Sequence, residues 1–203
     1  MIKTLIFDFG DVFINLDKEG AMNNALNLFE VETFPEELIA INSLYEQGLI
    51  SSEEFLEFYV ENFPKLSKKT ILDAWNYILR DFPTHRLEFL KTLAKTDDYK
   101  LILLSNTNKL HIDWIKDKVE FYDDFKNQFH VFYLSHEINL RKPNANIYEF
   151  VLLENNLKPE ECLFIDDTKE NTDSASKLGI HTWNINPTTE DVVNLFTINN
   201  HLF

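Results

Sequence analysis

Cysteine is nearly absent from this 203-residue chain, which contains only Cys162. A single thiol cannot form an internal disulfide, so we exclude a disulfide-stapled fold and expect Cys162 to be a small core residue. Glycine and proline are also scarce, at 4 and 6 residues, which argues against a disordered or fibrous chain. No apolar run is long enough for a membrane span, and Asp8 interrupts the N-terminal apolar run too early for a signal peptide. We therefore expect a cytoplasmic protein without membrane contact.

Basic residues are scarce as well. The chain has 19 Lys and Arg against 34 Asp and Glu, a formal net charge of −15, and a pI of about 4.7. Such a surface repels the phosphate backbone, which argues against nucleic acid as a partner. It also repels a small anionic substrate unless the binding site carries local positive charge. A site for an anion in this chain is therefore expected to contain a bound cation, a lysine or both.

Apolar residues, in contrast, make up 44% of the chain and include 18 Phe, which is enough for the core of one domain with a sizeable insertion. Five short runs are apolar nearly throughout, the pattern of parallel strands that are covered on both faces. They are residues 4–9, 100–105, 130–135, 162–166 and 180–185. Helical patterns, including 144–156 and 170–180, alternate with them. The alternation predicts an α/β fold with a Rossmann-like, doubly wound parallel sheet.

Residues 18–97 break this alternation because they contain no convincing strand. Their pattern indicates four or five helices, one of which, at 51–63, opens with a serine cap and an acidic first turn. We interpret the segment as an all-helical insertion after the first strand, with residues 84–97 rejoining the core as a crossover helix. The expected division is a core of residues 1–16 and 84–203 and a helical cap of residues 17–83.

Polar side chains follow four of the five predicted strands. In strand order they are Asp8, then Ser105 and Asn106, then Ser135 and Lys142, then Asp166 and Asp167. Ligands of open parallel sheets bind at the carboxyl ends of the strands. Clustered carboxylates repel one another, and magnesium (Mg²⁺), which prefers carboxylate and phosphate oxygens, relieves that repulsion. The pattern therefore predicts a site for Mg²⁺ and a phosphate group, with a lysine to balance charge and a carboxylate able to act as a nucleophile.

Four short motifs carry a resemblance to a known family. They are FDFGDV (7–12), LLSNTN (103–108), RKPNANIY (141–148) and FIDDTKEN (164–171). In this order they resemble the haloacid dehalogenase (HAD) superfamily of hydrolases, and the helical insertion lies where that superfamily carries its helical cap. The segment YEQGLISSEEF (45–55) also resembles a cap segment of this group.

The resemblance implies a role for each matching residue. It makes Asp8 the nucleophile that forms an aspartyl-phosphate, and Lys142 the residue that steadies both Asp8 and the transferring phosphoryl group. Ser105 and Asn106 are then phosphate binders. The implied magnesium ligands are Asp8, Asp167 and the backbone carbonyl of Gly10, with Asp166 in support beside them and Asn171 orienting the site.

Gly10 is a departure from the family pattern. Most phosphatases of this group read D-x-D, and the second aspartate gives general acid–base help worth roughly 10²–10⁴-fold. Asp11 is a candidate replacement acid and base, Asp17 is a second one, and a good leaving group such as an anomeric sugar phosphate is a third solution. The non-catalytic interpretations are a turn residue for Asp11 and a helix cap for Asp17. The segment also resembles a family branch reading F-D-x-G-x-V, which includes a bacterial phosphatase of glucose 1-phosphate.

The predicted function is a Mg²⁺-dependent phosphatase of a small phosphorylated metabolite, with a sugar phosphate as a candidate. One alternative is a metal-independent 2-haloacid dehalogenase, against which the adjacent acids Asp166 and Asp167 argue. Another is a phosphate-binding module with little turnover because of Gly10. We expect a monomer or a homodimer.

The cap contains three candidates for lining the substrate site, Trp75, Asn76 and Arg80. For two of them a structural interpretation is favoured: Trp75 packs between cap helices, and Arg80 lies on a solvated helix face. His111 and His136 follow strand ends, but their spacing does not indicate a metal site. They are expected to be structural or solvent-facing.

Overall fold

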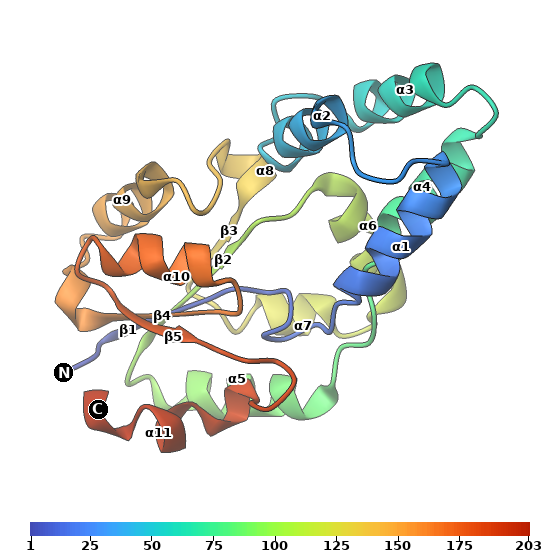
Figure 1. Ribbon diagram of the computed structural model, residues 1–203. Helices are drawn as coiled ribbons and strands as arrows, with labels where there is room; N and C mark the ends of the chain where they lie inside the picture. Colours follow the sequence, from blue (N-terminus) through green and yellow to red (C-terminus); the bar gives the residue numbers. More distant parts are fainter.

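The computed structural model describes residues 1–203 and contains one five-stranded parallel sheet, covered by helices on both faces, and a separate group of helices (Figure 1). The strands are β1 (Thr4–Phe7), β2 (Lys100–Ser105), β3 (Val131–Leu134), β4 (Cys162–Asp166) and β5 (His181–Asn184). They are ordered β3-β2-β1-β4-β5, and every pairing is parallel. The predicted doubly wound α/β fold is confirmed. None of the helices combines the length and the apolar character needed to span a membrane.

Alternate residues of each strand face opposite sides of the sheet, so both faces are buried. Leu5 and Phe7 of β1 face the larger core, together with α5 (Thr84–Thr96), α6 (Lys109–Lys118) and α7 (Tyr122–Lys126). Ile6 faces the other core with α9 (Ala145–Glu154) and α10 (Lys169–Ser176). In Figure 1, α9 and α10 lie above the sheet, and α5 and the short α11 (Leu195–Ile198) lie below it. One-turn 3₁₀ segments lie at Pro159–Glu161, Val192–Asn194 and Asn200–Leu202.

The inserted helices form a cap with its own core. They are α1 (Lys18–Phe29), α2 (Glu36–Glu46), α3 (Ser52–Asn62) and α4 (Lys68–Asn76). Phe55 and Tyr59 of α3 are buried at the centre of that core with rings from the other cap helices. The helix α3 begins after Ser51, whose side chain and that of Glu54 form a reciprocal capping box. The cap helices lie within residues 17–83, and that boundary itself stays a prediction.

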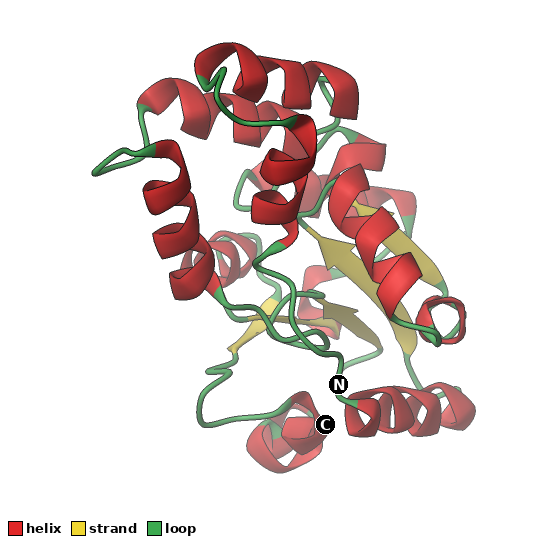
Figure 2. Cartoon of the chain, turned by 90° about the vertical axis from the view of Figure 1, so that its right-hand side faces the viewer, coloured by secondary structure: helices red, strands yellow, loops and turns green.

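Two chain segments join the cap to the sheet domain and run antiparallel to one another. Asn15 N donates to Asp81 O at 2.9 Å, Arg80 N donates to Asn15 O at 3.0 Å, and Asp17 N donates to Ile78 O at 2.9 Å. Leu16 and Leu79 form the bridge between them. Figure 2 shows these connections as loops running between the cap helices and the strands. We call residues 15–17 and 78–81 the connecting ribbon.

A second cap–core contact lies at the C-terminal end of α2, against α8 (Ser135–Ile138). The Ser135 hydroxyl donates to Glu46 O at 2.5 Å, and Asn139 Nδ2 donates to Gln47 O at 2.8 Å. Gly48 follows with a φ of +66°, and a Cβ there would lie 2.0 Å from the carbonyl oxygen of His136. This position therefore requires glycine both for its backbone conformation and for close approach.

Candidate active site

Asp8 lies directly beyond the central strand, between the ends of β2 and β4. Its N–H donates to Ile165 O at 2.9 Å, and its Oδ1 lies 2.9 Å from Lys142 Nζ. Burial raises the pKa of Asp8 to about 7; Lys142 opposes this rise, and the charges of Asp166 and Asp167 add to it. Ionised Asp8 is therefore costly without more positive charge nearby, which is the electrostatic condition that a bound cation relieves.

Lys142 is fully buried and contacts two carboxylates. Besides Asp8, its Nζ donates to Asp166 Oδ2 at 2.7 Å. Burial lowers the pKa of Lys142, but the charges of Asp166 and Asp8 outweigh it, so the net pKa is raised. The lysine is therefore a permanent positive charge beside Asp8.

The side chain of Asn106 contacts the backbone of Lys142, and its expected role in phosphate binding stays a prediction. Its Oδ1 accepts from Lys142 N at 3.0 Å, and its Nδ2 donates to Lys142 O at 2.9 Å. Both ends of the amide are thus used to hold the peptide of the lysine. Ser105, in contrast, is buried at the end of β2, and its hydroxyl has only a 3.4 Å contact with Asn106 O.

Asp166 is fully buried and its oxygens are saturated with donors. Thr168 N donates to Oδ1 at 2.8 Å, and Asn171 Nδ2 lies 3.1 Å and 3.0 Å from the two oxygens. Together with Lys142 these contacts fix Asp166 behind the reacting edge. The supporting roles expected for Asp166 and Asn171 stay predictions.

Three carboxylates converge at this edge of the sheet. One oxygen from each of Asp8, Asp166 and Asp167 lies within 4.8 Å of the others. Carboxylate oxygens are hard ligands, which bind Mg²⁺ in preference to softer metal ions. The residues present therefore fit a magnesium ion. Asp8, Asp167 and the Gly10 carbonyl stay its predicted ligands.

Lys18, the first residue of α1, reaches this cluster from the cap and was not expected from the sequence. Its Nζ pairs with Asp167 Oδ2 and lies 2.9 Å from Asp11 Oδ2. Burial lowers the pKa of Lys18, but hydrogen bonds to Asp167 and Asp11 more than compensate, so the net pKa is raised. Its position directly after the helix cap Asp17, at the entry to the insertion, is the only sequence feature that could have indicated it.

Asp11 and Asp17 occupy different environments. Asp11 is buried with a φ of +54°, and its Oδ1 accepts from Leu16 N at 2.9 Å while its other oxygen faces Lys18. Asp17 caps α1 by accepting from Gly20 N at 2.8 Å and pairs with Arg80 at 2.5 Å. Asp17 is therefore a helix cap, whereas Asp11 remains beside the carboxylate cluster.

Leu16 takes up part of the space that a second acid would need. A Cβ at Gly10 would lie 2.7 Å from Leu16 Cδ1. An aspartate at position 10 therefore requires Leu16 to move.

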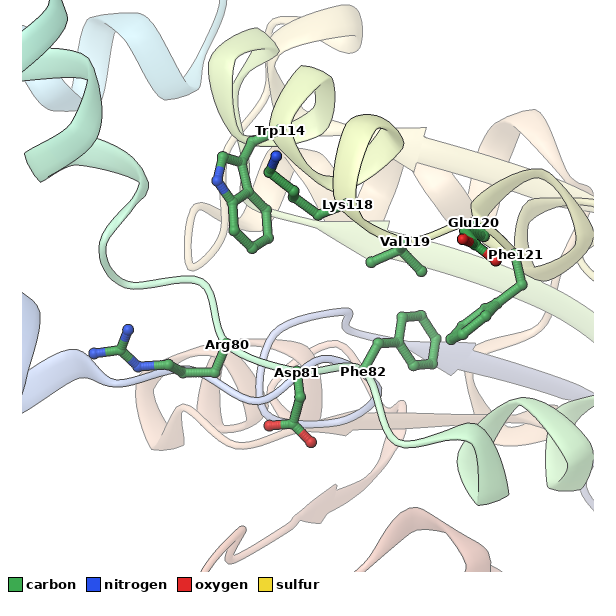
Figure 3. A pocket seen from close by; sticks show the side chains of 8 residues that line it. All are labelled: Arg80, Asp81, Phe82, Trp114, Lys118, Val119, Glu120 and Phe121. Carbon is green, nitrogen blue, oxygen red and sulfur yellow. The ribbon is translucent and has the colours of Figure 1, made fainter.

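Of the remaining candidates from the sequence, Trp75 and His111 line a cavity of about 610 Å³ together with Lys18. Trp75 stacks on His111 with ring centroids 5.2 Å apart, and Asn76 is buried. Burial lowers the pKa of His111 to about 4 and also lowers that of His136, which favours the neutral imidazole of both at pH 7. Arg80 is directed away from Phe82 and Val119 at the edge of a surface pocket of about 490 Å³ (Figure 3), whose lining includes none of Asp8, Asp166 and Asp167.

The haloacid dehalogenase-like hydrolase family matches residues 2–179. The chain belongs to this family. The motifs that carried the resemblance thus lie in the matched region, at the edge of the sheet where the carboxylates meet.

Individual relatives of this HAD-like hydrolase are similar over nearly their whole length. It is 28% identical over 191 residues to a D-ribitol-5-phosphate phosphatase of Bacteroides thetaiotaomicron, covering 90% of this chain and 91% of the relative. A HAD family enzyme of the same organism, solved with magnesium and inorganic phosphate, is 36% identical with a TM-score of 0.83, covering 97% and 100% of the two chains. A 2-haloacid dehalogenase of Pseudomonas syringae pv. Tomato shares only the fold, at 15% identity and a TM-score of 0.60 over the full length of both chains.

A cavity of about 610 Å³ in this hydrolase lies between the cap helices and the core. Lys18 lines it and also contacts Asp167, so the cavity adjoins the carboxylate cluster. Arg141, which precedes Lys142, and His111 are the core residues in its lining. Its location and size are those of a pocket for a small metabolite.

Proposed function

We propose that the chain is a Mg²⁺-dependent phosphatase of a small phosphorylated metabolite, with Asp8 as the nucleophile. The observation that carries the proposal is the buried arrangement of Asp8 and Lys142 beside Asp166 and Asp167. It lies at the carboxyl ends of parallel strands, where ligands of this fold class bind. The magnesium and phosphate bound by the 36% identical relative support the same chemistry.

In this mechanism an oxygen of Asp8 attacks phosphorus, the new O–P bond forms, and the ester P–O bond breaks as the alcohol leaves. Water then cleaves the aspartyl-phosphate, which returns the carboxylate and releases inorganic phosphate. Lys142 orients Asp8 and offsets charge on the phosphoryl group, while the Ser105 hydroxyl donates to a phosphate oxygen. A bound magnesium ion would supply further charge neutralisation at this point.

Asp11 is the proposed acid and base in place of an aspartate at position 10. It is the buried carboxylate that shares Lys18 with Asp167. Protonation of the leaving oxygen and activation of water by such a group are worth roughly 10²–10⁴-fold. We expect Asp11→Asn to lose activity in this range on an alkyl phosphate and less on an aryl phosphate, whose leaving group needs little protonation.

The proposed substrate class is a sugar or polyol phosphate. The 28% identical relative is a D-ribitol-5-phosphate phosphatase, and its similarity covers the cap as well as the core. In a capped site the cap contributes to the choice of substrate. Similarity across the cap therefore supports a leaving group of the same chemical class as that of the relative.

The decisive experiment measures phosphate release from p-nitrophenyl phosphate and D-ribitol 5-phosphate with Mg²⁺ and with EDTA. Asp8→Asn should reduce both rates by more than about 10³-fold, because the nucleophile is lost. Equal rates for this variant and the parent would refute the assignment. Halide release from a 2-haloacid in EDTA would instead favour the dehalogenase.

A further inference from the structure

An ion pair between Glu46 and Arg141 joins the cap to the core beside the proposed active site. Arg141 Nε donates to Glu46 Oε2 at 2.7 Å. The side chain of Arg141 is 33% exposed, and that of Glu46 is 25% exposed. Both residues line the 610 Å³ cavity between the cap and the core. Glu46 belongs to the YEQG segment of the sequence, to which the proposed chemistry gives no role.

The guanidinium of Arg141 is fixed from two sides. Glu46 holds it from the cap, and its NH1 donates to Lys142 O at 3.2 Å in the core. These contacts use two of its five N–H groups, and Glu46 Oε1 accepts no hydrogen bond within the chain. The pair therefore offers further donors and an acceptor at the boundary of the cavity.

The cavity has two chemically different sides. Besides the apolar Ile39, α2 supplies the polar side chains of Asn42, Ser43 and Glu46. Apart from Lys18, α1 and α4 supply apolar and aromatic side chains such as Ala21, Ala25 and Ile71. A polyhydroxylated carbon chain matches both sides, because its hydroxyls bind polar groups and its carbons pack on apolar ones.

The charge of the cavity favours a neutral leaving group. Arg141 is compensated by Glu46, and Lys18 already faces Asp11 and Asp167. A carboxylate or second phosphate on the leaving group would find no uncompensated positive charge there, and Glu46 would repel it.

We propose that Glu46 and Arg141 are specificity-determining residues that bind hydroxyl groups of a neutral, polyhydroxylated leaving group. The inference rests on the proposed phosphatase function. A site built to hydrogen-bond hydroxyls rejects an analogue that lacks them, because its polar groups are then left without partners. The pair therefore discriminates against alkyl phosphates as well as against anionic ones.

The test compares kcat/KM for D-ribitol 5-phosphate, n-pentyl phosphate, 3-phosphoglycerate and p-nitrophenyl phosphate. The kcat/KM of the parent for ribitol 5-phosphate should exceed its kcat/KM for n-pentyl phosphate and for 3-phosphoglycerate by at least about 10-fold. In Glu46→Gln and Arg141→Gln, the ratio of kcat/KM for ribitol 5-phosphate to that for p-nitrophenyl phosphate should fall by about 10- to 100-fold, mainly through KM. Because the two residues act as a pair, the double variant should fall by less than the product of the single effects.

Asp73→Asn is the matched control, since it removes the exposed Lys69–Asp73 pair on α4 and should leave this ratio unchanged. Equal losses on both substrates in the Glu46 and Arg141 variants would show a structural role only and overturn the inference. A parent without preference for ribitol 5-phosphate over n-pentyl phosphate would also overturn it. If the parent hydrolyses none of the four esters, the phosphatase proposal itself fails, which is a distinguishable result.

Discussion

At the scale of single residues, Gly48 shows the strictest backbone requirement in the cap. Its φ is +66°, and a Cβ there would lie 2.0 Å from the backbone oxygen of His136, which cannot move without displacing α8. We expect Gly48→Ala to lower the free energy of unfolding by roughly 1–3 kcal/mol from backbone strain alone, with an added cost from the clash.

Gly179→Ala provides the control in chemical denaturation. Gly179 also has a positive φ, +85°, but its nearest contact would be Pro159 Cβ at 3.6 Å. It should therefore lose only the strain component. If both variants lose the same stability, the close approach at Gly48 has no energetic weight.

His111 predicts a pH dependence of stability. Burial lowers the pKa of His111 from 6.5 to about 4. Between these values the unfolded chain binds more protons, so stability rises with pH through this window, is complete above pH 6.5 and is lost as pH falls towards 4. The contribution is at most about 3 kcal/mol. Urea titrations from pH 4 to 7 should show that the free energy of unfolding depends less steeply on pH in His111→Gln than in the parent. Both proteins retain His136, so its contribution is the same in each. Parallel curves for the two proteins would contradict the prediction.

Single residues also mark the limit of what the sequence predicts. Asp8, Lys142 and Asp167 were predicted because the ends of parallel strands meet at one edge, and the structure brings them together. Lys18 and the Glu46–Arg141 pair were missed, since their partners lie across the contact between cap and core. No periodicity in the sequence specifies that contact.

At the scale of elements, each of the five apolar runs in the sequence predicted one strand of the sheet, with bounds that differ from the observed ones by at most two residues. The bounds of β2 and β4 match the predicted 100–105 and 162–166, whereas β1 ends at Phe7 rather than at residue 9. The difference arises because Phe9 is buried by side chains, including a stack on Phe125, although the ladder has already ended. The helices α6 and α7 were not predicted, and the predicted helix 170–180 ends at Ser176 in the structure.

The N-terminus of α1 gives a prediction that separates capping from catalysis. Asp17→Ala removes the acceptor for Gly20 N and the partner of Arg80. We expect a loss of about 1 kcal/mol in the free energy of unfolding, and a fall in kcat of less than about tenfold, far below that expected for an acid and base. Asp11→Asn, measured alongside, should show the larger kinetic loss. The reverse order would make Asp17 the acid.

At the scale of the whole molecule, 34 acidic residues and a net charge of −15 make a divalent ion a stabilising ligand. At a concentration of 100 times Kd, Mg²⁺ should raise the free energy of unfolding by about 2.7 kcal/mol. For a chain of this size the corresponding rise in Tm is about 5–10 °C. Thermal melts with MgCl₂, against NaCl of equal ionic strength, measure this shift. Asp167→Asn should largely abolish it, and an undiminished shift in that variant would place the ion elsewhere.

The connecting ribbon has a consequence for the history of such molecules. The chain leaves the sheet domain and returns to it through neighbouring segments that are hydrogen-bonded to each other. The intervening helices could therefore be exchanged for an unrelated module without a change in the order or connections of the strands. New specificities could then arise by replacing this module while the reaction chemistry beneath it is inherited intact.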